Sequence, residues 1–415
     1  MADQIKRPRG TIDYYGDEEK VLSKMREILF NEAHLYNADK VELPMFEENR
    51  LFHRTVGESS DIVQKETFDL ARKGDKDYTL RPEFTASVSR AVIENKLYTL
   101  PDMPLRFSYM GPVFRYERPQ TGRLRQFNQF GVEFLDAKVD LATTLDAFLL
   151  SLRAAEKVLG HKVRAKINFL GSFESRENYK KELYAFFKPK IDSMCDDCKR
   201  RLETNPLRIL DCKVDSDRVI ASSAPKVSDY LNDADKDEYS KIKEALDEIK
   251  IEYEVDDELV RGLDYYTGLV WELYDTEKET LGAIGGGGKY ANLMKNIGGP
   301  DFEGIGFSLG IERLIIALTD ERRKELIGED ELDYFIIDFA KDGYGSFIAD
   351  SLRNEGKAVT FSSYSRAMGG AFKMADRKKA KNVLIIETDH RIQLKNMKER
   401  TQVEISLEDL LKEGK

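Results

Sequence analysis

Four arginines crowd one short segment of the chain, and arginine is well suited to binding phosphate. Arg115, Arg118, Arg123 and Arg125 follow one another with only one acidic residue, Glu117, among them. The planar guanidinium group donates paired hydrogen bonds to phosphate oxygens. The segment could therefore hold a nucleotide, with an arginine on a phosphate and Glu117 on the base. A ladder of surface ion pairs is the alternative interpretation.

A second segment could bind an ammonium group. Residues 80–85 read Leu-Arg-Pro-Glu-Phe-Thr, so the carboxylate of Glu83 and the hydroxyl of Thr85 flank Phe84 just after a proline. The same residues could also be an ordinary helix start.

Two glycine-containing segments carry further polar side chains. Residues 260–268 place Arg261 and two tyrosines between glycines, ahead of an apolar strand. A buried aromatic pair is the alternative there. Residues 304–313 read Gly-Ile-Gly-Phe-Ser-Leu-Gly-Ile-Glu-Arg, which predicts a strand that turns tightly into a helix carrying Glu312 and Arg313.

Neither of two common nucleotide motifs fits these glycines. A dinucleotide-binding fingerprint has two residues between its second and third glycine, whereas residues 307–309 make three here. Residues 288–290, Gly-Lys-Tyr, mimic a phosphate loop. However, Ala283 stands where its first glycine belongs, and Tyr290 replaces the serine or threonine. The sequence therefore excludes NAD binding and a phosphate loop.

The arginine-rich segment lies in a predicted hairpin that spans residues 105–136. Side chains alternate between the two faces of a strand. Apolar residues share one parity: Phe114, Tyr116, Phe130, Val132 and Phe134. Polar residues share the other: Arg115, Glu117, Gln129 and Glu133. The pattern predicts one apolar core face and one polar working face.

The remaining elements suggest two domains and an insertion. Apolar spacing predicts a helix over 18–37, and the strand Lys40–Leu43 is closed by Pro44. Residues 171–255 are charge-rich and predict an inserted helical module. A charged stretch, Glu321 to Glu331, leads to a small α/β segment with strands at 335–339, 358–361 and 383–386 and helices at 345–354 and 369–379.

Composition limits the class of protein. The chain has 415 residues, a net charge of −10, and 41% hydrophobic residues, which fits two or three domains. No membrane helix or signal peptide is predicted, which favours the cytoplasm. A local basic patch remains a candidate RNA contact: Lys373, Arg377, Lys378, Lys379 and Lys381. A solvated helix face is its alternative.

Cysteine use favours a reducing compartment. There are three cysteines, Cys195, Cys198 and Cys212, too few and too uneven for a disulfide framework. The pair at 195 and 198 could begin a zinc site, but a closed site needs four ligands. We therefore expect surface thiols and no metal site.

Taken together and in this order, the segments resemble the histidine-specific class II aminoacyl-tRNA synthetases over essentially the whole chain. The helix and strand before Pro44 are similar to motif 1, which builds the dimer interface in that family. Residues 114–127 are similar to motif 2, and Gly306–Arg313 to motif 3. Residues 259–266, Leu-Val-Arg-Gly-Leu-Asp-Tyr-Tyr, are similar to the histidine-specific signature, and Gly285–Tyr290 to its second signature. Asn128 departs from the histidine more often found at that position.

The resemblance implies an α+β fold: an antiparallel sheet of six or so strands flanked by helices. A class II catalytic domain would span 1–325, with the helical module at about 171–255 inserted. An α/β anticodon-binding domain would span 331–415. The implied activity is ATP-dependent conversion of L-histidine to histidyl-adenylate and its transfer to the 3′ end of histidine tRNA. Mg²⁺ would bridge the leaving phosphates. The partners would be histidine, both ends of histidine tRNA and a second copy of the chain, without membrane or DNA.

The resemblance also assigns roles by position. Glu83 and Thr85 would hold the amino group of histidine, and its pocket would be completed by Phe84, Arg115, Gln129, Glu133, Arg261, Tyr265 and Tyr266. A neutral imidazole needs one acceptor and one donor, which Glu133 and the Tyr266 hydroxyl could provide. ATP would be bound by Arg115 at the α-phosphate, Arg313 at the γ-phosphate, Glu117 near the adenine, and Arg123.

Catalysis in the resembling family is positioning and electrostatic stabilisation. Arg115, Arg261 and Arg313 would be the catalytic residues, with Arg261 beside the α-phosphate where other class II enzymes place an additional metal ion. The residues expected to meet the tRNA acceptor end are Arg118, Gln120 and Arg125. The alternative is an inactive paralogue that acts as a regulatory or tRNA-sensing subunit. Such paralogues typically lose the Arg261-type signature or the anticodon domain, and both are present here.

Overall fold

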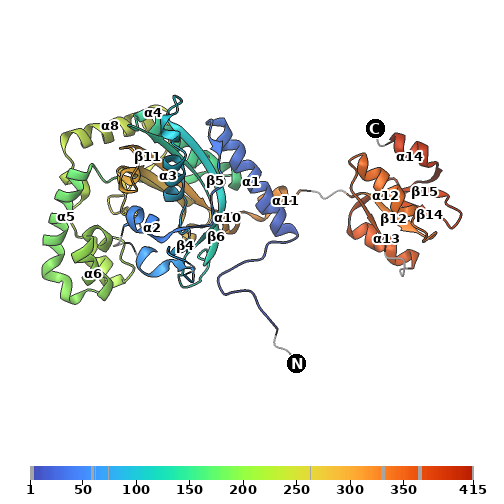
Figure 1. The fold of residues 1–415 in the computed structure, drawn as a ribbon, viewed down its shortest axis with the longest axis horizontal. Coiled ribbons are helices and arrows are strands. Elements are labelled where there is room, and N and C mark those ends of the chain that lie inside the picture. Colours follow the sequence, from blue (N-terminus) through green and yellow to red (C-terminus); the bar gives the residue numbers. More distant parts are fainter. Residues whose placement is uncertain are drawn as a thin grey trace. The chain divides into compact units, whose positions relative to one another are not determined.

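The computed structural model describes residues 4–57, 60, 62–72, 74–261, 263–328, 332–362 and 367–413. Gly262 and Glu331, which belong to two predicted segments, lie outside this part. The chain divides into two compact units, Met1–Ile327 and Gly328–Lys415, shown in Figure 1. No helix in the described part is long and apolar enough to cross a membrane.

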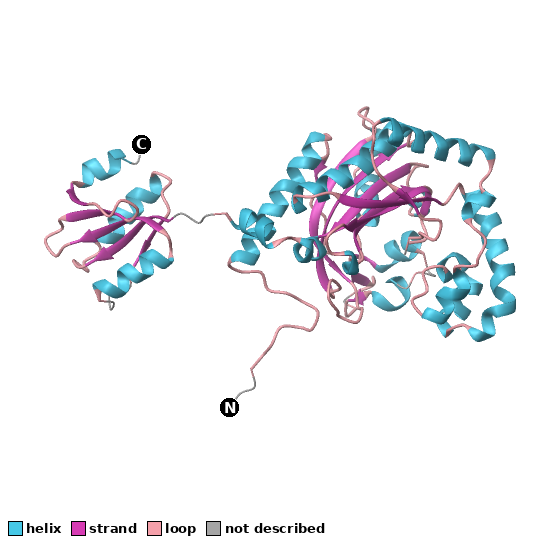
Figure 2. Cartoon of the chain, turned by 180° about the vertical axis from the view of Figure 1, so that it is seen from behind, coloured by secondary structure: helices cyan, strands magenta, loops and turns pink. Residues whose placement is uncertain are grey.

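The first unit is built on an eight-stranded sheet with the order β1-β5-β6-β11-β10-β9-β7-β8. The six inner strands pair antiparallel: β5 (Leu105–Phe114), β6 (Gln126–Asp136), β7 (Val163–Phe169), β9 (Tyr266–Asp275), β10 (Ala283–Tyr290) and β11 (Glu303–Gly310). The α+β class with an antiparallel sheet is therefore confirmed. Two short edge strands, β1 (Asp39–Lys40) and β8 (Glu254–Val255), add parallel pairs that the sequence did not predict. Figure 2 shows the sheet with helices against it.

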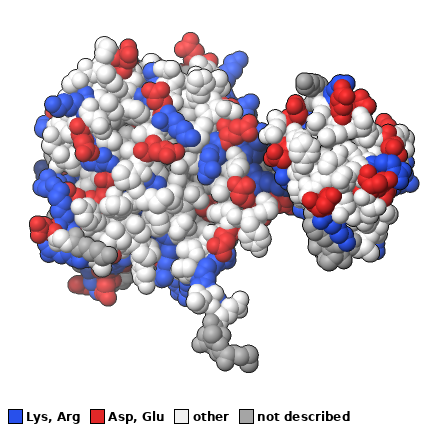
Figure 3. Space-filling view, turned by 45° about the vertical axis from the view of Figure 1, so that its right-hand side comes forward, with Lys and Arg blue, Asp and Glu red and all other residues white. Residues whose placement is uncertain are grey.

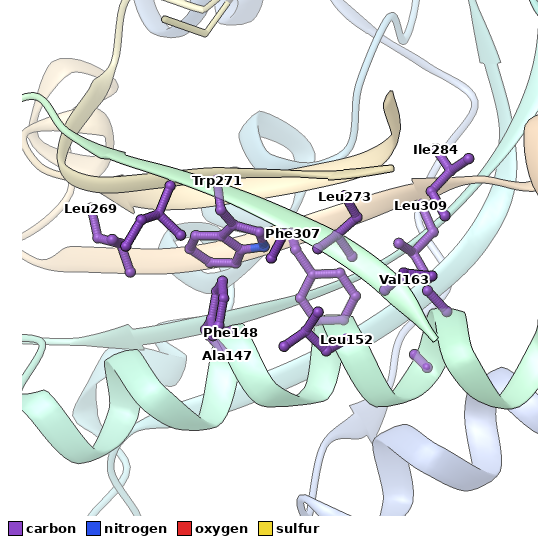
Figure 4. Close-up of a cluster of buried hydrophobic side chains, with 14 of the residues drawn as sticks. Ala147, Phe148, Leu152, Val163, Leu269, Trp271, Leu273, Ile284, Phe307 and Leu309 are labelled. Atoms are coloured by element: carbon purple, nitrogen blue, oxygen red, sulfur yellow. The ribbon is translucent and has the colours of Figure 1, made fainter. Parts of the chain in front are cut away.

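One face of this sheet is filled with large apolar side chains and covered by helices. The covering helices are α1 (Asp17–Leu35) and α4 (Leu141–Leu159), and α10 (Ile311–Ala317) packs beside them. Asp140 caps α4 by accepting a hydrogen bond from the backbone N–H of Thr143. Phe148 on α4 meets Trp271 on β9 edge to face, with ring centroids 5.5 Å apart (Figure 4). This face forms the main core.

The opposite face of the central strands is lined by the smallest residues. On β11, Ile305, Phe307 and Leu309 point into the helix-covered core, so the alternating positions face the other way. Those positions are Gly304, Gly306, Ser308 and Gly310. Beside them, β10 carries the glycine run 285–288. This small-residue face leaves room above the sheet that larger side chains would fill.

Smaller elements frame the small-residue face. They are α2 (Asn49–Val56), α3 (Thr85–Glu94), α9 (Leu293–Asn296), and a three-stranded sheet of β2 (Phe46–Glu48), β3 (Phe68–Asp69) and β4 (Tyr78–Leu80). Val88 and Val92 of α3 pack in one apolar cluster with Tyr109 and Tyr290. The frame therefore rests on the sheet through apolar contacts.

The predicted hairpin is partly confirmed. Phe130, Val132 and Phe134 are fully buried on the core face, as the alternation predicts. The placement of Tyr116 on that face is wrong, because its side chain is 52% exposed. Strand β5 ends at Phe114, so Arg115 and Tyr116 begin a loop in which strand parity no longer holds.

The region expected to be helical holds α5 (Phe173–Phe187), α6 (Asp196–Thr204), α7 (Asp215–Ala221) and α8 (Asp233–Glu248) between β7 and β8. We call it the helical segment. Its buried side chains join the same core as the helix-covered face of the sheet. The expectation of surface thiols is wrong: Cys198 and Cys212 are buried in this core, and Cys195 is half-buried.

The second unit is a small mixed sheet between helices. Its strand order is β13-β12-β14-β15-β16. Parallel strands β12 (Leu332–Asp338), β13 (Val359–Phe361) and β14 (Ala380–Ile386) match the three predicted strands, and antiparallel β15 (Ile392–Asn396) and β16 (Gln402–Ile405) extend the sheet. The helices are α12 (Tyr344–Asn354), α13 (Met368–Arg377) and α14 (Leu407–Glu413), while α11 (Asp320–Ile327) closes the first unit.

Candidate active site

A cavity of ≈ 650 Å³ lies over the small-residue face of the sheet. Its volume suits a small-molecule site. Thirteen of the residues expected in a site line it: Glu83, Phe84, Thr85, Arg115, Glu117, Gln120, Arg123, Gln129, Glu133, Arg261, Tyr265, Tyr266 and Arg313. The fold thus brings together four distant parts of the chain, residues 83–85, 115–133, 261–266 and 313. Arg118 and Arg125 do not line the cavity.

Glu133 is the polar centre of one end of the cavity. Its side chain comes from the small-residue face of β6 and is 2% exposed. Three hydroxyl groups donate to its carboxylate: Thr85 at 2.7 Å and Tyr109 at 3.0 Å on Oε1, and Tyr290 at 2.8 Å on Oε2. A carboxylate offers about four acceptor positions, so one position remains for a ligand.

Burial raises the pKa of Glu133 to about 7, against the opposing effect of its three hydroxyl donors. The nearby Glu83 carboxylate adds to the rise. Glu133 therefore changes charge close to neutral pH. A group of this kind in a cavity is typical of a functional site.

Glu83 caps helix α3 and faces the same end of the cavity. Its carboxylate accepts hydrogen bonds from the backbone N–H groups of Thr85 (2.6 Å) and Ala86 (3.0 Å). Burial raises its pKa, and those backbone donors oppose the rise. The cap fixes the carboxylate while leaving lone pairs for a ligand ammonium group.

Aromatic rings form the walls around these carboxylates. Phe84 stacks on Tyr109 with centroids 4.2 Å apart, and Tyr265 lies 4.7 Å from Tyr266 and 5.5 Å from Tyr290. A Cβ atom on Gly288 would approach the Tyr266 ring to 2.7 Å. The second glycine-rich signature therefore has a physical cause: β10 lacks side chains where the tyrosine lies against it.

Arg261 lies across the middle of the cavity and pairs with Glu272 of β9. Its Nη1 donates to Glu272 Oε1 at 2.8 Å, and its guanidinium lies 5.5 Å from the Tyr266 ring centroid. Burial alone would lower the pKa of Arg261, but Tyr266 and Glu272 raise it, so the group stays charged. No acceptor in the described part of the chain lies within hydrogen-bonding distance of its buried Nε. A buried donor without a partner is costly, which favours a ligand oxygen there.

The other end of the cavity is lined by arginines. Arg115 donates to the carbonyl of Pro82 at 3.0 Å, and Arg313 donates to the carbonyls of Gly122 (3.0 Å) and Ala283. Burial lowers the pKa of Arg313, and Arg123 adds to this. Repulsion between neighbouring arginines is relieved when anionic oxygens bind among them.

A tight turn presents the arginine-rich loop to this end. Gln120 and Arg123 exchange backbone hydrogen bonds of 3.1 and 2.9 Å around Thr121 and Gly122, and Gly122 has a φ of 71°. That left-handed conformation favours glycine. Arg123 also lies 3.6 Å from Glu117. The turn therefore orients a charged pair toward the cavity.

Glu312 serves a structural purpose at the edge of the arginine end. Its carboxylate accepts hydrogen bonds from the backbone and side-chain nitrogens of Asn128 and from the Tyr14 hydroxyl at 2.8 Å. Burial raises its pKa, which these donors partly offset. The amide of Asn128 thus ties the start of α10 to β6.

Several lining residues were not predicted as site residues. They are Tyr109, Asp211, Lys213, Glu272 and Tyr290. Tyr290 was part of the glycine-rich signature, so its position was visible in the sequence. Tyr109 and Glu272 reach the cavity through strand pairing, and Asp211 and Lys213 through the fold of the helical segment, neither of which spacing along the chain reveals.

Comparison with known proteins identifies the family of the chain. Residues 10–314 match the family model described as Histidyl-tRNA synthetase. The histidine–tRNA ligase of Bacillus subtilis (strain 168) is 40% identical over 414 residues, 97% of each chain. That of Staphylococcus carnosus (strain TM300) is 42% identical over 419 residues, 98% of this chain and 97% of its own. The crystal structure of apo S. aureus histidyl-tRNA synthetase superposes with a TM-score of 0.82 at 34% identity, covering 99% of this chain and 100% of that chain. The chain therefore belongs to the histidyl-tRNA synthetase family.

Proposed function

We propose how the cavity residues of this histidine–tRNA ligase divide the work of activating histidine with ATP. The two ends of the cavity differ in charge. The Glu133 end is lined by carboxylates and hydroxyls, and the opposite end by Arg115, Arg123 and Arg313. Histidine carries an ammonium group and a polar ring, whereas ATP carries phosphates. Charge complementarity therefore favours histidine at the first end and the ATP phosphates at the second.

Histidine recognition depends on paired hydrogen bonds inside a dry pocket. The imidazole would donate to Glu133 and accept from the Tyr266 hydroxyl, while Gln129 and Tyr265 complete the walls. Glu83 and Thr85 would hold the ammonium group, and the ring of Phe84 lies between them in sequence. An amino acid with an apolar side chain would leave Glu133 and Tyr266 unpaired, which the pocket rejects strongly.

ATP would lie across the arginine end. Arg115 would contact the α-phosphate, Arg313 the γ-phosphate, and Glu117 and Arg123 the remainder of the nucleotide. ATP enters such sites with Mg²⁺, which needs one or two carboxylates besides phosphate oxygens. Glu272 lines the cavity and could offer one. The ion would offset charge on the leaving phosphates.

The reaction then needs no nucleophile from the protein. A carboxylate oxygen of histidine attacks the α-phosphorus, the bond to the bridging oxygen breaks, and pyrophosphate leaves. Arg261 would stabilise the charge on the α-phosphoryl oxygens, since its buried Nε has no acceptor in the described part of the chain. This orphaned donor between the two ends is the observation that carries the proposal.

The second half-reaction transfers histidine to the tRNA terminal adenosine. Arg118 and Gln120 are exposed on the loop after β5, and Arg125 lies with its guanidinium 4.0 Å from the Tyr116 ring centroid. These residues would contact the acceptor end. The anticodon would meet the second unit, where the basic patch at residues 373–381 is exposed. On the face drawn in Figure 3, charges of both signs are interspersed, so RNA contact depends on such local groups.

A homodimer in the cytoplasm completes the proposal. Met45 and Phe46 follow Pro44 in the segment similar to motif 1, and their side chains are about half exposed, at 52% and 51%. Exposed apolar residues next to each other favour a covered interface. Sedimentation at several concentrations measures the oligomeric state, and a monomer throughout contradicts this part.

The test of the catalytic proposal is histidine-dependent exchange of pyrophosphate into ATP. We expect Arg261→Ala to lower kcat by about 10²–10³-fold, as for loss of one preorganised donor, while histidine still binds. Arg261→Lys keeps the charge but not the planar fork, so it should recover only part of the rate. The matched control is Arg153→Ala, which removes an arginine on α4 outside the cavity.

Two outcomes contradict the assignment. Unchanged exchange by Arg261→Ala would remove Arg261 from catalysis. Absence of exchange by the wild-type chain, with histidine still bound, would overturn the activation reaction and favour a regulatory subunit.

A further inference from the structure

Three cysteines and one aspartate meet in the helical segment, outside the residues that line the active-site cavity. The Sγ atoms of Cys195, Cys198 and Cys212 and a carboxylate oxygen of Asp217 all lie within 4.8 Å of one another. The Sγ atoms of Cys195 and Cys212 are 3.8 Å apart, and the Sγ of Cys212 is 3.4 Å from Oδ2 of Asp217. The half motif seen in the sequence thus gains a fourth ligand that is neither cysteine nor histidine.

These distances match the edges of a tetrahedron around zinc. With Zn–S bonds of about 2.3 Å, two sulfurs of a regular tetrahedron lie about 3.8 Å apart. With a Zn–O bond of about 2.0 Å, the sulfur–oxygen edge is about 3.5 Å. A disulfide would instead bring two sulfurs to about 2.0 Å. Both separations therefore fit coordination, and the sulfur–sulfur separation does not fit a disulfide.

The surroundings of Asp217 point to a bound cation. Its side chain is 1% exposed, and no Lys, Arg or His nitrogen of the described residues lies within 4.0 Å of its carboxylate. Its hydrogen bonds come from the backbone N–H of Cys195 at 3.0 Å, the Cys212 thiol, and the Ser216 hydroxyl at 3.3 Å. Burying a carboxylate without a charged partner is costly even when it accepts hydrogen bonds. A divalent ion among the thiolates removes that cost.

The backbone holds the four ligands on short, well-defined turns. Cys195 is the residue before α6 and Cys198 lies in the first turn of that helix. Cys212 follows a 3-10 turn at Pro206–Ile209, and its N–H donates to the carbonyl of Ile209 at 3.0 Å. Asp217 lies in the first turn of α7. Such preorganised turns present ligands with little loss of conformational entropy.

We propose that Cys195, Cys198, Cys212 and Asp217 bind one Zn²⁺ ion as a closed structural site. Three soft thiolates and one carboxylate favour zinc over magnesium or calcium, which prefer oxygen ligands. Four protein ligands leave no open position for a substrate, so the ion holds structure and performs no chemistry. The site does not depend on the proposed catalytic roles.

The ion would cross-link the two ends of a loop that borders the active-site cavity. Cys198 and Cys212 close a loop that contains Asn205 and Arg208, and both of these bind Oδ1 of Asp264, at 2.8 and 3.0 Å. Asp264 belongs to the histidine-specific signature, directly before the two tyrosines. On either side of Cys212, Asp211 and Lys213 line the cavity. Closing the loop therefore fixes one wall of the histidine site.

The experiment measures metal in the full-length chain, purified without a polyhistidine tag and under reducing conditions. Elemental analysis should find one zinc ion per chain in the wild type and almost none in Cys198→Ser. Asp217→Cys should retain the ion through a fourth thiolate. After replacement of zinc by Co²⁺, its sulfur-to-cobalt charge-transfer absorption should exceed that of the wild type. Ser216→Ala is the matched control, because it removes a neighbour of Asp217 that is not a ligand, and it should keep the zinc.

A second measurement holds even if Cys198→Ser fails to fold. In the wild type, alkylation of the three cysteines should be slow with zinc bound and become fast after a chelator removes it. The proposal would be overturned if the alkylation rates change neither on addition of the chelator nor on addition of zinc. So would a wild type that contains no zinc and takes up no Co²⁺, or zinc content unchanged in Cys198→Ser. Fewer than three free thiols in the unfolded, unreduced chain would indicate a disulfide and also overturn it.

Discussion

Glu133 should govern how histidine activation depends on pH. Its pKa is raised to about 7, and the imidazole of free histidine has a pKa of about 6.5. The pocket needs the ionised carboxylate as acceptor and the neutral ring as both donor and acceptor. Both fractions fall as the pH falls through neutrality. The specificity constant kcat/KM for histidine reports the pKa values of the free enzyme and the free substrate.

The expected change follows from the two titrations. Between pH 8 and pH 6 the ionised fraction of a group with a pKa of about 7 falls about tenfold. The neutral fraction of imidazole falls about fourfold over the same range. Since both forms are needed, kcat/KM should fall by about 40-fold in the wild type. In Glu133→Gln only the fourfold change of the substrate should remain.

The assay is pyrophosphate exchange at saturating ATP and constant ionic strength, with circular dichroism to confirm folding at each pH. At pH 8 we expect Glu133→Gln to be about 10–100-fold slower, because it loses a hydrogen bond to a charged group. This deficit should shrink about tenfold at pH 6. Glu83, whose pKa burial also raises, is present in both proteins and contributes to both pH profiles. If the ratio of wild-type kcat/KM to Glu133→Gln kcat/KM does not change with pH, the role of Glu133 is refuted.

Three further predictions test other parts of the site. Tyr290→Phe removes a 2.8 Å donor to Glu133, so the pKa of Glu133 should rise by about one to two units and the pH profile should move to higher pH by that amount; an unmoved profile contradicts this. In Gly306→Ala the new Cβ would lie 1.9 Å from Oε2 of Glu133, so chemical denaturation should show a loss of about 1–3 kcal/mol together with lost exchange activity. Gly369→Ala, with no atom within 4 Å, should change stability by less than about 0.5 kcal/mol, and equal effects of the two substitutions would contradict the packing argument. Arg118→Ala should leave pyrophosphate exchange unchanged and raise the KM for histidine tRNA. The slope of the logarithm of tRNA affinity against the logarithm of salt concentration should become smaller by about one. A loss of exchange activity as large as the loss of charging would place Arg118 in the cavity instead.

The sequence predicted the polar residues of the site better than the way they are connected. Glu133 was expected from strand alternation, and it lies on the expected face of β6. Its partners Tyr109 and Tyr290 were not assigned, because they come from β5 and β10, which lie on either side of β6 within the sheet. Arg261 was expected as well, yet its pairing with Glu272 depends on the register of the β9 loop and strand.

The sequence-based predictions were wrong where a strand pattern was extended beyond the end of the strand, and where the proposed metal-binding group includes an aspartate instead of a cysteine or histidine. Tyr116 was placed on the core face by extending strand parity beyond Phe114, where the chain turns into a loop. The cysteines were expected at the surface because a search for cysteine and histidine finds no fourth ligand. Asp217 has no motif of its own, and only the folded helical segment brings its carboxylate within 4.8 Å of the thiols.

The small-residue face of the sheet limits how the enzyme's substrate range can be changed. The floor of the cavity is largely main chain at Gly285, Gly286 and Gly306. Main-chain atoms cannot be exchanged by substitution. A Cβ atom added at Gly306 would meet Glu133, and one added at Gly288 would meet Tyr266. Laboratory evolution toward a smaller or larger amino acid must therefore act through the walls, at positions such as Phe84, Tyr265 and Gln129. If histidine binds where we propose, the glycines that make room for it also remove the simplest route by which another amino acid could replace it.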